Sequence, residues 1–294
     1  MRGMDMGWTI VIVIGVLALV FATYQGIVQN MLHISKMSVT LPEESAPGTD
    51  FPGTIVVLSD LHNHSFGRDN ERLIKAVRDA KPDLIAIPGD LIIRHRDNTK
   101  VAVKLLQALC EIGVPVVYSL GNHESAFREE KPEAYNEYLA QIANENLTVL
   151  DNACMRYADG VCICGMSVPK ECYYKTGRRY VLTEASWDAI EPEPAKEDYI
   201  ILLAHTPYYF KQYASFGADL VLAGHLHGGI VRLPRFGGVI SPQMELMPKY
   251  DAGIYEHEGT SMVVSRGLGT HFPPVRVNNL PELIVLTLEK KRKE

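Results

Sequence analysis

Eight polar side chains of types that bind metal ions or move protons follow five short apolar runs of the sequence. They are Asp60 and His62 after 55–58, Asp90 after 84–87, Asn122 and His123 after 114–118, His205 after 199–204, and His225 and His227 after 220–223. In open α/β sheets, ligands bind outside the carboxyl ends of the strands. If each run is a strand of such a sheet, five strand ends deliver these side chains toward one place.

The donor atoms of this set predict a centre with two metal ions. Imidazole nitrogens combined with carboxylate oxygens suit Mn, Fe or Zn better than Ca or Mg, which prefer oxygen ligands alone. The set also exceeds what one tetrahedral zinc needs. Two divalent ions about 3.5–4 Å apart, sharing a bridging carboxylate, would use all of the ligands. Gly89, Gly121 and Gly224 each precede a predicted ligand, where the lack of a Cβ permits a sharp turn and close backbone approach.

The elements that must position these residues alternate along the chain. Helical periodicity at 70–80, 99–111 and 132–143 separates the first apolar runs, which predicts parallel, buried strands and an α/β fold class. A later part rich in strands predicts a second sheet packed on the first. Its apolar segments are 161–165, 199–204, 220–223, 230–233, 262–265 and 283–288. Residues 170–180 are expected to form a polar excursion over the surface.

The order of these motifs resembles that of the calcineurin-like metallophosphoesterases. The motifs D-x-H, G-D, G-N-H-E, H and G-H-x-H stand here at 60–62, 89–90, 121–124, 205 and 224–227, and the resemblance covers roughly residues 55–290. The tail, with GGIVRLP, SRGLG and NNLPELIVLTL, resembles the bacterial YkuE-type branch, whose members often start with a membrane or export segment. The resemblance implies an α/β fold in which two mixed β-sheets are sandwiched and flanked by helices.

The same resemblance implies a role for each residue of the site. One metal ion would be held by Asp60, His62 and His227, the other by Asn122, His205 and His225, and Asp90 would bridge the two. His123 would be catalytic, contacting the phosphate or the leaving oxygen rather than a metal ion. A hydroxide bridging the ions would attack phosphorus in line, while the ions offset charge in the transition state.

One position departs from the pattern of the family. Many relatives place an acid a few residues after the G-D aspartate, where it can orient the catalytic histidine, but here Ile93 and Arg94 follow. Asp97 is shifted and Glu124 is a candidate only because it is adjacent, so the group that orients His123 stays open. For His64 a solvated loop position is favoured, and for His271 a place near the site is an even alternative. Candidate phosphate-binding residues are Arg128, Lys175, Arg178, Arg179 and Arg232.

The N-terminus predicts a membrane helix. No charged residue occurs from Met6 to Leu32, and the apolar stretch 8–28 would form a helix about 31 Å long, which matches the hydrocarbon core of a bilayer. A cleaved signal peptide is the alternative, but Ala22-Thr23-Tyr24 lacks a small residue at its third position. We favour an uncleaved single-pass anchor, with the catalytic domain outside the cytoplasm because the leading segment is so short.

Length and composition limit the domain organisation, the partners and the cysteine chemistry that we expect of the chain. The expected organisation is an anchor at 1–32, a strand and linker at 33–53, and the metallophosphoesterase domain at 54–294. A net charge of −6 argues against a nucleic-acid partner, although bound cations would still attract a phosphate. The five cysteines are odd in number and lack zinc spacing, so we expect buried free thiols rather than disulfides.

The function expected from all this is hydrolysis of a phosphodiester, phosphomonoester or pyrophosphate bond. The substrate would be a phosphorylated small molecule or a compound linked to an envelope lipid. A non-catalytic metal-binding scaffold of the same fold is the alternative from another class, although none of the ligands nor His123 is replaced. A β-lactamase-like metallohydrolase is disfavoured, because its H-x-H-x-D-H motif near the start of the chain is missing.

Overall fold

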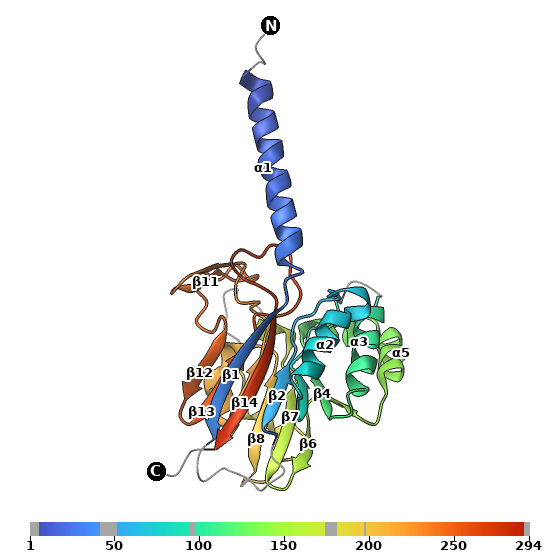
Figure 1. Ribbon diagram of the computed structural model, residues 1–294. Coiled ribbons are helices and arrows are strands. Elements are labelled where there is room, and N and C mark those ends of the chain that lie inside the picture. Colours follow the sequence, from blue (N-terminus) through green and yellow to red (C-terminus); the bar gives the residue numbers. More distant parts are fainter. Residues whose placement is uncertain (1–5, 42–51, 95–97, 174–180, 197, 291–294) are drawn as a thin grey trace.

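Two six-stranded sheets packed face to face make up the body of the protein, and one long helix projects from it (Figure 1). The computed structural model describes residues 6–41, 52–94, 98–173, 181–196 and 198–290. The first sheet has the strand order β1-β14-β2-β3-β4-β5 and the second β12-β13-β9-β8-β7-β6. The predicted fold class, two mixed sheets flanked by helices, is confirmed.

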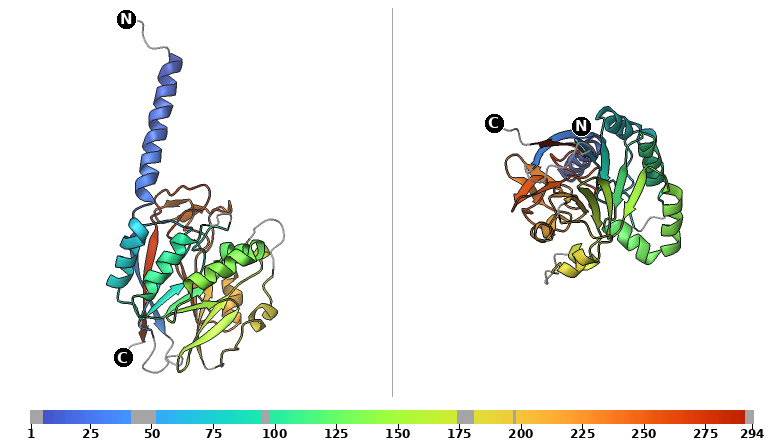
Figure 2. Two further views of the ribbon diagram at one scale, coloured as in Figure 1. Left: turned by 90° about the vertical axis from the view of Figure 1, so that its right-hand side faces the viewer. Right: turned by 90° about the horizontal axis from the view of Figure 1, so that it is seen from below.

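The first sheet contains four parallel neighbours, β2 to β5, whose helices cover its outer face. Its strands are β1 (His33–Leu41), β2 (Thr54–Val57), β3 (Leu84–Ile87), β4 (Val116–Ser119), β5 (Leu147–Leu150) and β14 (Glu282–Lys290). The helices that cover it are η1 (Arg68–Asn70), α2 (Glu71–Asp79), α3 (Lys100–Cys110), α4 (Asn122–Glu130) and α5 (Pro132–Ile142). Leu73 and Val77 of α2 are spaced one helical turn apart and are both buried against the sheet. Figure 2 shows these helices as one outer layer.

The second sheet follows in sequence and carries fewer helices. Its strands are β6 (Ala153–Ala158), β7 (Val161–Met166), β8 (Tyr199–Ala204), β9 (Leu220–Ala223), β12 (Gly253–His257) and β13 (Thr260–Val264). Short helices η2 (Lys170–Tyr173), α6 (Glu184–Asp188), η3 (Pro207–Tyr209) and α7 (Phe210–Ser215) occur between its strands. A separate hairpin joins β10 (Val231–Leu233) to β11 (Gly237–Ile240).

The core lies in three layers because the central strands are buried on both faces. In β2, Val56 packs toward the helices, while Ile55 and Val57 pack between the two sheets. In β8, Ile201 and Leu203 fill the same space from the opposite side. Successive side chains of a strand point to opposite faces, so strands buried on both sides must be continuously apolar. That requirement explains the unbroken apolar runs of the sequence.

Several elements differ from the sequence prediction. The last strand, β14, does not join the second sheet but lies between β1 and β2 of the first. Helix α4 begins directly at Asn122 and was not predicted, because its charged sequence NHESAFREE has little apolar periodicity. Part of the expected polar excursion at 170–180 is instead buried, since Cys172 and Tyr173 lie in the core, and 174–180 fall outside the described residues.

The expectation that the cysteines are free thiols is wrong for two of the five. Cys154 and Cys164 form a disulfide, whereas Cys110, Cys162 and Cys172 are free and buried as predicted. The two bonded residues lie directly opposite each other on the antiparallel strands β6 and β7, with Cα atoms 4.1 Å apart. Their pairing depends on the strand register, which cysteine spacing alone does not reveal.

Helix α1 (Met6–Val28) is long and apolar enough to cross a membrane, and a signal sequence would have the same character. Its side chains are exposed up to Tyr24, whereas Gln25 and Val28 are buried against the domain. Directly after it, β1 enters the first sheet and pairs with β14 over its whole length.

A buried arginine fixes the loop between β13 and β14. The Arg276 guanidinium donates hydrogen bonds to the carbonyl oxygens of Arg266, Gly267 and Gly269, and its side chain is almost fully buried. Hydrogen bonds from a charged donor are the strong ones, and buried carbonyl groups left unpaired would carry a full desolvation cost. The loop therefore depends on one side chain for its shape.

Replacing Arg276 by Met keeps much of its apolar bulk and removes these hydrogen bonds. We expect the free energy of unfolding to fall by about 3 kcal/mol, since each hydrogen bond from a charged donor contributes roughly 1.5–3 kcal/mol and the losses are not additive. Urea denaturation in detergent measures this change, with exposed Arg235→Met as the control. Equal stability of the two variants would contradict the structural role of Arg276.

Candidate metal centre

The eight residues singled out in the sequence converge on one end of the molecule. They follow the carboxyl ends of β2, β3, β4, β8 and β9, which all open toward the same side. Asn122 and His123 additionally form the first turn of α4. Seven of the eight are buried, and Asn122 is partly buried. Three groups of metal-binding atoms result: Asp60 with His62 and His227, His62 with Asp90 and His123, and Asp90 with His205 and His225.

The distances between these side chains are those expected of atoms that share an ion. His62 Nε2 lies 3.1 Å from His227 Nε2, which in turn lies 3.4 Å from Asp60 Oδ1. His205 Nε2 lies 3.0 Å from Asp90 Oδ2, and His62 Nε2 is 3.8 Å from the same oxygen. Metal–ligand bonds of about 2.1 Å place neighbouring ligand atoms about 3 Å apart. Asp90 Oδ2 thus lies between the two groups.

For two of the histidines, backbone carbonyls set which ring nitrogen faces the site. His227 Nδ1 lies 3.3 Å from Gly269 O, and His205 Nδ1 lies 3.1 Å from Pro88 O. Because a carbonyl can only accept, each Nδ1 must carry the hydrogen, which leaves the Nε2 lone pair directed into the site. The Nε2 lone pair of His227 therefore faces His62 Nε2 at 3.1 Å, where either a hydrogen on His62 or a bound cation would satisfy it.

Buried polar atoms without partners point the same way. Within the described part of the chain, Asn122 Oδ1 and His205 Nε2 are buried and form no hydrogen bond, although His205 Nε2 lies within ion-pair distance of Asp90 Oδ2. A buried acceptor left unpaired costs about 1–3 kcal/mol, and native structures seldom tolerate one without a compensating group. Divalent cations would satisfy both atoms, so the residues present fit a pair of metal ions.

The backbone at the site adopts conformations that side chains rarely take. Asp60, His62, Asp90, His225 and His227 all have left-handed backbones, with φ between 48° and 70°. Such conformations cost roughly 1–3 kcal/mol each and persist only where the surroundings enforce them. Here hydrogen bonds between the turns enforce them, among them Asp60 N to Gly89 O and His62 N to Asp90 O.

Two glycines allow the turns to approach one another. A Cβ built on Gly121 would lie 2.1 Å from Asp90 Oδ1, and one on Gly224 would lie 2.2 Å from Asp60 Oδ2. Any larger residue would push the carboxylates away from the other ligands. The sequence suggested that glycine allows close backbone approach at these positions, and the clash of a Cβ with the carboxylates gives the steric reason.

Burial keeps three histidines of the site neutral, which is the form in which an imidazole can bind a metal ion. Burial lowers the pKa of His62 to about 3 and holds the pKa values of His225 and His227 well below the usual range. Burial also opposes protonation of His205, but Asp90 and Asp60 outweigh it and raise its pKa to about 9. A metal ion bound there would have to compete with a proton for the Nε2 atom of His205.

The two carboxylates titrate at different values although they lie in one cluster. Burial raises the pKa of Asp60 to about 6. Burial would raise the pKa of Asp90 as well, but the neighbouring His205 and His123 hold it well below its usual value. Asp90 therefore keeps its charge to a lower pH than Asp60 does, which suits a position shared by two cations.

Glu124 acts as a support for the loops rather than as the partner of His123. Its carboxylate accepts hydrogen bonds from the backbone N–H groups of Asp90, Ile92 and Gly121 at 2.8–3.1 Å. Burial, helped by Asp90, raises the pKa of Glu124 to about 7. The side chain thus ties the turn that carries Asp90 to the start of α4.

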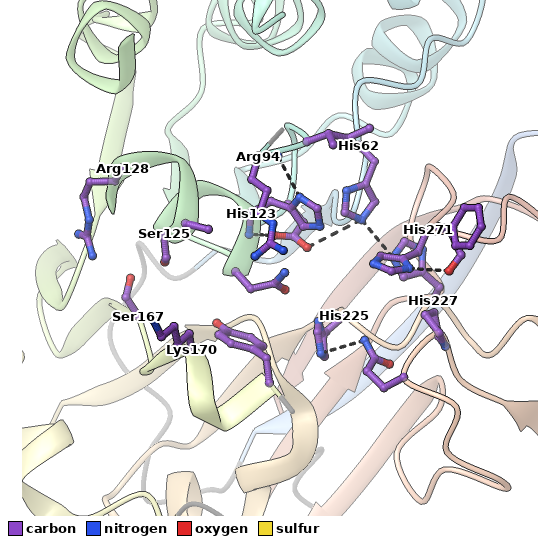
Figure 3. Close-up of a pocket in the computed structure, with 18 of the residues that line it drawn as sticks. His62, Arg94, His123, Ser125, Arg128, Ser167, Lys170, His225, His227 and His271 are labelled. Carbon is purple, nitrogen blue, oxygen red and sulfur yellow. Dashed lines mark hydrogen bonds and ion pairs between the residues drawn. The ribbon is translucent and has the colours of Figure 1, made fainter. Parts of the chain in front are cut away.

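The group that orients His123 is the main chain of Arg94. The Arg94 N–H donates to His123 Nδ1 at 3.1 Å, so the neutral ring must carry its hydrogen on Nε2. Burial lowers the pKa of His123, which favours this neutral form. Figure 3 shows the ring beside His62, with His271 farther along the same wall. Asp97, the shifted acid considered from the sequence, lies outside the described residues.

A pocket of about 1460 Å³ opens in front of these residues (Figure 3). His64 and His271 both line it, so the expectation that His64 is a solvated loop residue is wrong. Arg128 lines it too and pairs with Asp151. Arg232, by contrast, pairs with Asp251 away from the pocket, and Lys175, Arg178 and Arg179 lie outside the described residues.

Sequence reasoning missed other residues at the site. Gln243 Nε2 lies 3.1 Å from His225 Nε2, and the ring of Tyr173 packs against those of His205 and His225. Lys170 also lines the pocket. Lys170 and Tyr173 belong to the short helix η2, and Gln243 lies in a loop. None of them follows an apolar run or belongs to a motif, so the sequence carried no signal that would have found them.

Several known proteins are similar to this chain in sequence. An uncharacterized metallophosphoesterase of Aquifex aeolicus is 28% identical over 94% of this chain and 98% of its own length. YkuE of Bacillus subtilis is 28% identical over 80% of this chain and 78% of its own length, and phosphodiesterase YaeI of Escherichia coli is 28% identical over 81% and 82%. Among solved structures, a dimetal phosphatase from Danio rerio aligns with 74% of this chain and 88% of its own, with a TM-score of 0.38 and 11% identity.

The family itself follows from a direct match. The sequence profile of the calcineurin-like phosphoesterases covers residues 53–229, which includes every residue of the metal-binding groups. The five strand ends, the paired ligand groups and this match lead to one conclusion: the chain belongs to the calcineurin-like phosphoesterase family, whose members are metal-dependent phosphoester hydrolases.

Proposed function

We propose that this protein hydrolyses a phosphodiester, phosphomonoester or pyrophosphate bond with two divalent ions in the centre described above. Asp60, His62 and His227 would hold one ion, and Asn122, His205 and His225 the other. Asp90 would bridge them. The single observation that carries the proposal is the position of Asp90 Oδ2, within 3.0 Å of His205 Nε2 and 3.8 Å of His62 Nε2.

The protein's own groups would bind and orient the phosphoryl group. When bound, the two ions would make a water molecule acidic and offset the charge on the phosphoryl oxygens. His123 presents Nε2–H to the pocket, where it would donate a hydrogen bond to a phosphoryl or leaving-group oxygen. Arg128 and Lys170 line the same pocket and would attract the anionic substrate.

We further propose that α1 anchors the enzyme in a membrane, with residues 54–294 as the catalytic domain outside the cytoplasm. The length and apolar character of Met6–Val28 support the anchor. The Cys154–Cys164 disulfide supports an oxidising compartment. An anchored enzyme would meet envelope or lipid-linked phosphate compounds, which we propose as its substrates.

Replacing Asp90 by Asn tests the bridging role with almost no change in shape. We expect turnover of an aryl phosphodiester in the presence of Mn²⁺ to fall at least about a thousandfold, and bound metal to fall with it, because the shared charge is lost. Chelation of the unaltered enzyme should abolish turnover, and added Mn²⁺ should restore it.

The control for this experiment is Asp79→Asn, which changes an exposed carboxylate on α2. Full turnover by Asp90→Asn would rule out the bridging role. Two bound ions in the unaltered protein, with no turnover of any phosphodiester, phosphomonoester or pyrophosphate, would instead favour a metal-binding scaffold.

Replacing His123 by Ala separates catalysis from metal binding. We expect kcat to fall about a hundredfold, because one hydrogen-bond donor to the transition state is lost, while two ions stay bound. Steady-state kinetics and elemental analysis of the same sample measure the two quantities. His33→Ala, on the exposed start of β1, serves as the control. Loss of metal from His123→Ala would show that this residue is a ligand instead.

A further inference from the structure

The active-site end of the domain is also the end from which helix α1 departs. Strand β1 begins at His33, five residues after α1, and runs parallel to β14. Strand β14 is antiparallel to β2, so the carboxyl end of β2, where Asp60 and His62 follow, lies on the side where β1 begins. The topology therefore places the base of the helix and the metal centre on one side of the molecule (Figure 1).

The helix is docked on the loop that forms one wall of the pocket. The Gln25 side chain accepts a hydrogen bond from Arg276 N at 2.9 Å and donates one to Arg276 O at 3.1 Å. Gln29 Nε2 donates to Pro274 O at 2.7 Å. The same loop contributes His271 and Phe272 to the pocket. These contacts fix α1 to the domain without a flexible linker between them.

This docking leaves no spare length of helix between the domain and a bilayer. The part of α1 before Gln25 is about 28 Å long at 1.5 Å per residue, while the hydrocarbon core is about 30 Å thick. All of that part is needed to span the core. The surface of the domain around the base of α1 must then lie at the lipid headgroups.

The surface of the domain around the base of α1 exposes large apolar side chains, which a surface facing water would seldom gather in one place. Phe272 is 82% exposed, Leu246 71%, and Phe236 and Met244 69% each. With the less exposed Leu233 and Met247, we call these residues the apolar surface. Backbone hydrogen bonds between Val277 and Ile230, and between Arg232 and Val277, tie the β10–β11 hairpin to the loop beneath α1. Exposed apolar residues gathered on one side mark an interaction site.

We propose that the apolar surface rests on the bilayer, so that the pocket opens at the headgroup layer and the enzyme cleaves phosphoesters whose lipid chains remain in that leaflet. The inference rests on the proposed phosphoester hydrolysis and names its substrate class. A bilayer fits this surface because α1 already enters it at the same place. The exposed Arg235 beside Phe236 adds a positive charge where anionic headgroups would lie.

The experiment uses the full chain in phosphatidylcholine vesicles and two chromogenic diesters with the same reacting group. Ethyl p-nitrophenyl phosphate is soluble, and hexadecyl p-nitrophenyl phosphate stays in the vesicle. The triple variant F236S/M244S/L246S removes three residues of the apolar surface that lie outside the pocket. We expect the triple variant to cleave the soluble diester at the unaltered rate. We expect it to cleave the lipid diester about tenfold more slowly, because it loses part of its contact with the bilayer. I254S, on β12, is the matched control.

Equal rates of the triple variant and the unaltered enzyme on the lipid diester would overturn the proposal. A second measurement does not need turnover. In the variants Leu246→Cys and Ile254→Cys, a fluorophore is attached to the introduced cysteine. Lipids with nitroxide headgroups quench a fluorophore that touches the bilayer. The native free cysteines are buried, and the unaltered chain corrects for their labelling.

Quenching of the fluorophore at 246 but not at 254 supports docking of the apolar surface on the bilayer, even if neither diester is cleaved. Such quenching without cleavage of either diester would count against the proposed phosphoester hydrolysis and not against the docking. Equal quenching at both positions, or a chain that does not stay with the vesicles, would overturn the docking itself.

Discussion

The structure depends on the burial of two carboxylates among five imidazoles. Asp60 and Asp90 are almost fully buried, and burying isolated charges is costly unless opposite charges or hydrogen bonds compensate them. Asp60 accepts hydrogen bonds from Ser59 Oγ and from the backbone N–H of His225, and Asp90 accepts one from the backbone N–H of His123. The bond from His225 joins a turn of the second sheet to a turn of the first, and the bond from His123 joins two turns of the first sheet. The residues that position the Asp60 carboxylate therefore also join the two halves of the sandwich.

Much of the site was predictable because its residues occupy a position that the fold itself defines. A buried parallel strand produces an apolar run, and the first polar residues after it lie at the edge where ligands bind. That reasoning placed Asp60, Asp90 and His205 in one region before any contact was known. It failed where residues come from irregular loops, as for Gln243, and where a pairing depends on register, as for Cys154. It also failed for β14, because a final strand of apolar residues fits either sheet equally well.

The group that contacts His123 Nδ1 differs from the one that the family pattern predicts. The sequence lacks an acid at the expected place, and Ile93 there is apolar. A backbone N–H from the next residue, Arg94, meets Nδ1 instead of a carboxylate. A donor at that nitrogen favours a neutral ring with hydrogen on Nε2, whereas a carboxylate would favour a charged ring. The substitution changes the protonation state that the surroundings of His123 favour, while the place of the ring in the pocket is kept by α4.

The position of β14 between β1 and β2 has a consequence for biosynthesis. Strand β1 pairs with β14 alone in the first sheet, yet the two lie almost at opposite ends of the sequence. During translation, residues 33–41 emerge early and have no partner until the final strand is made, and such distant pairing slows folding. The first sheet can therefore be completed only after β14 has been synthesised, long after β1, and until then the backbone hydrogen-bonding groups of β1 lack their partner strand.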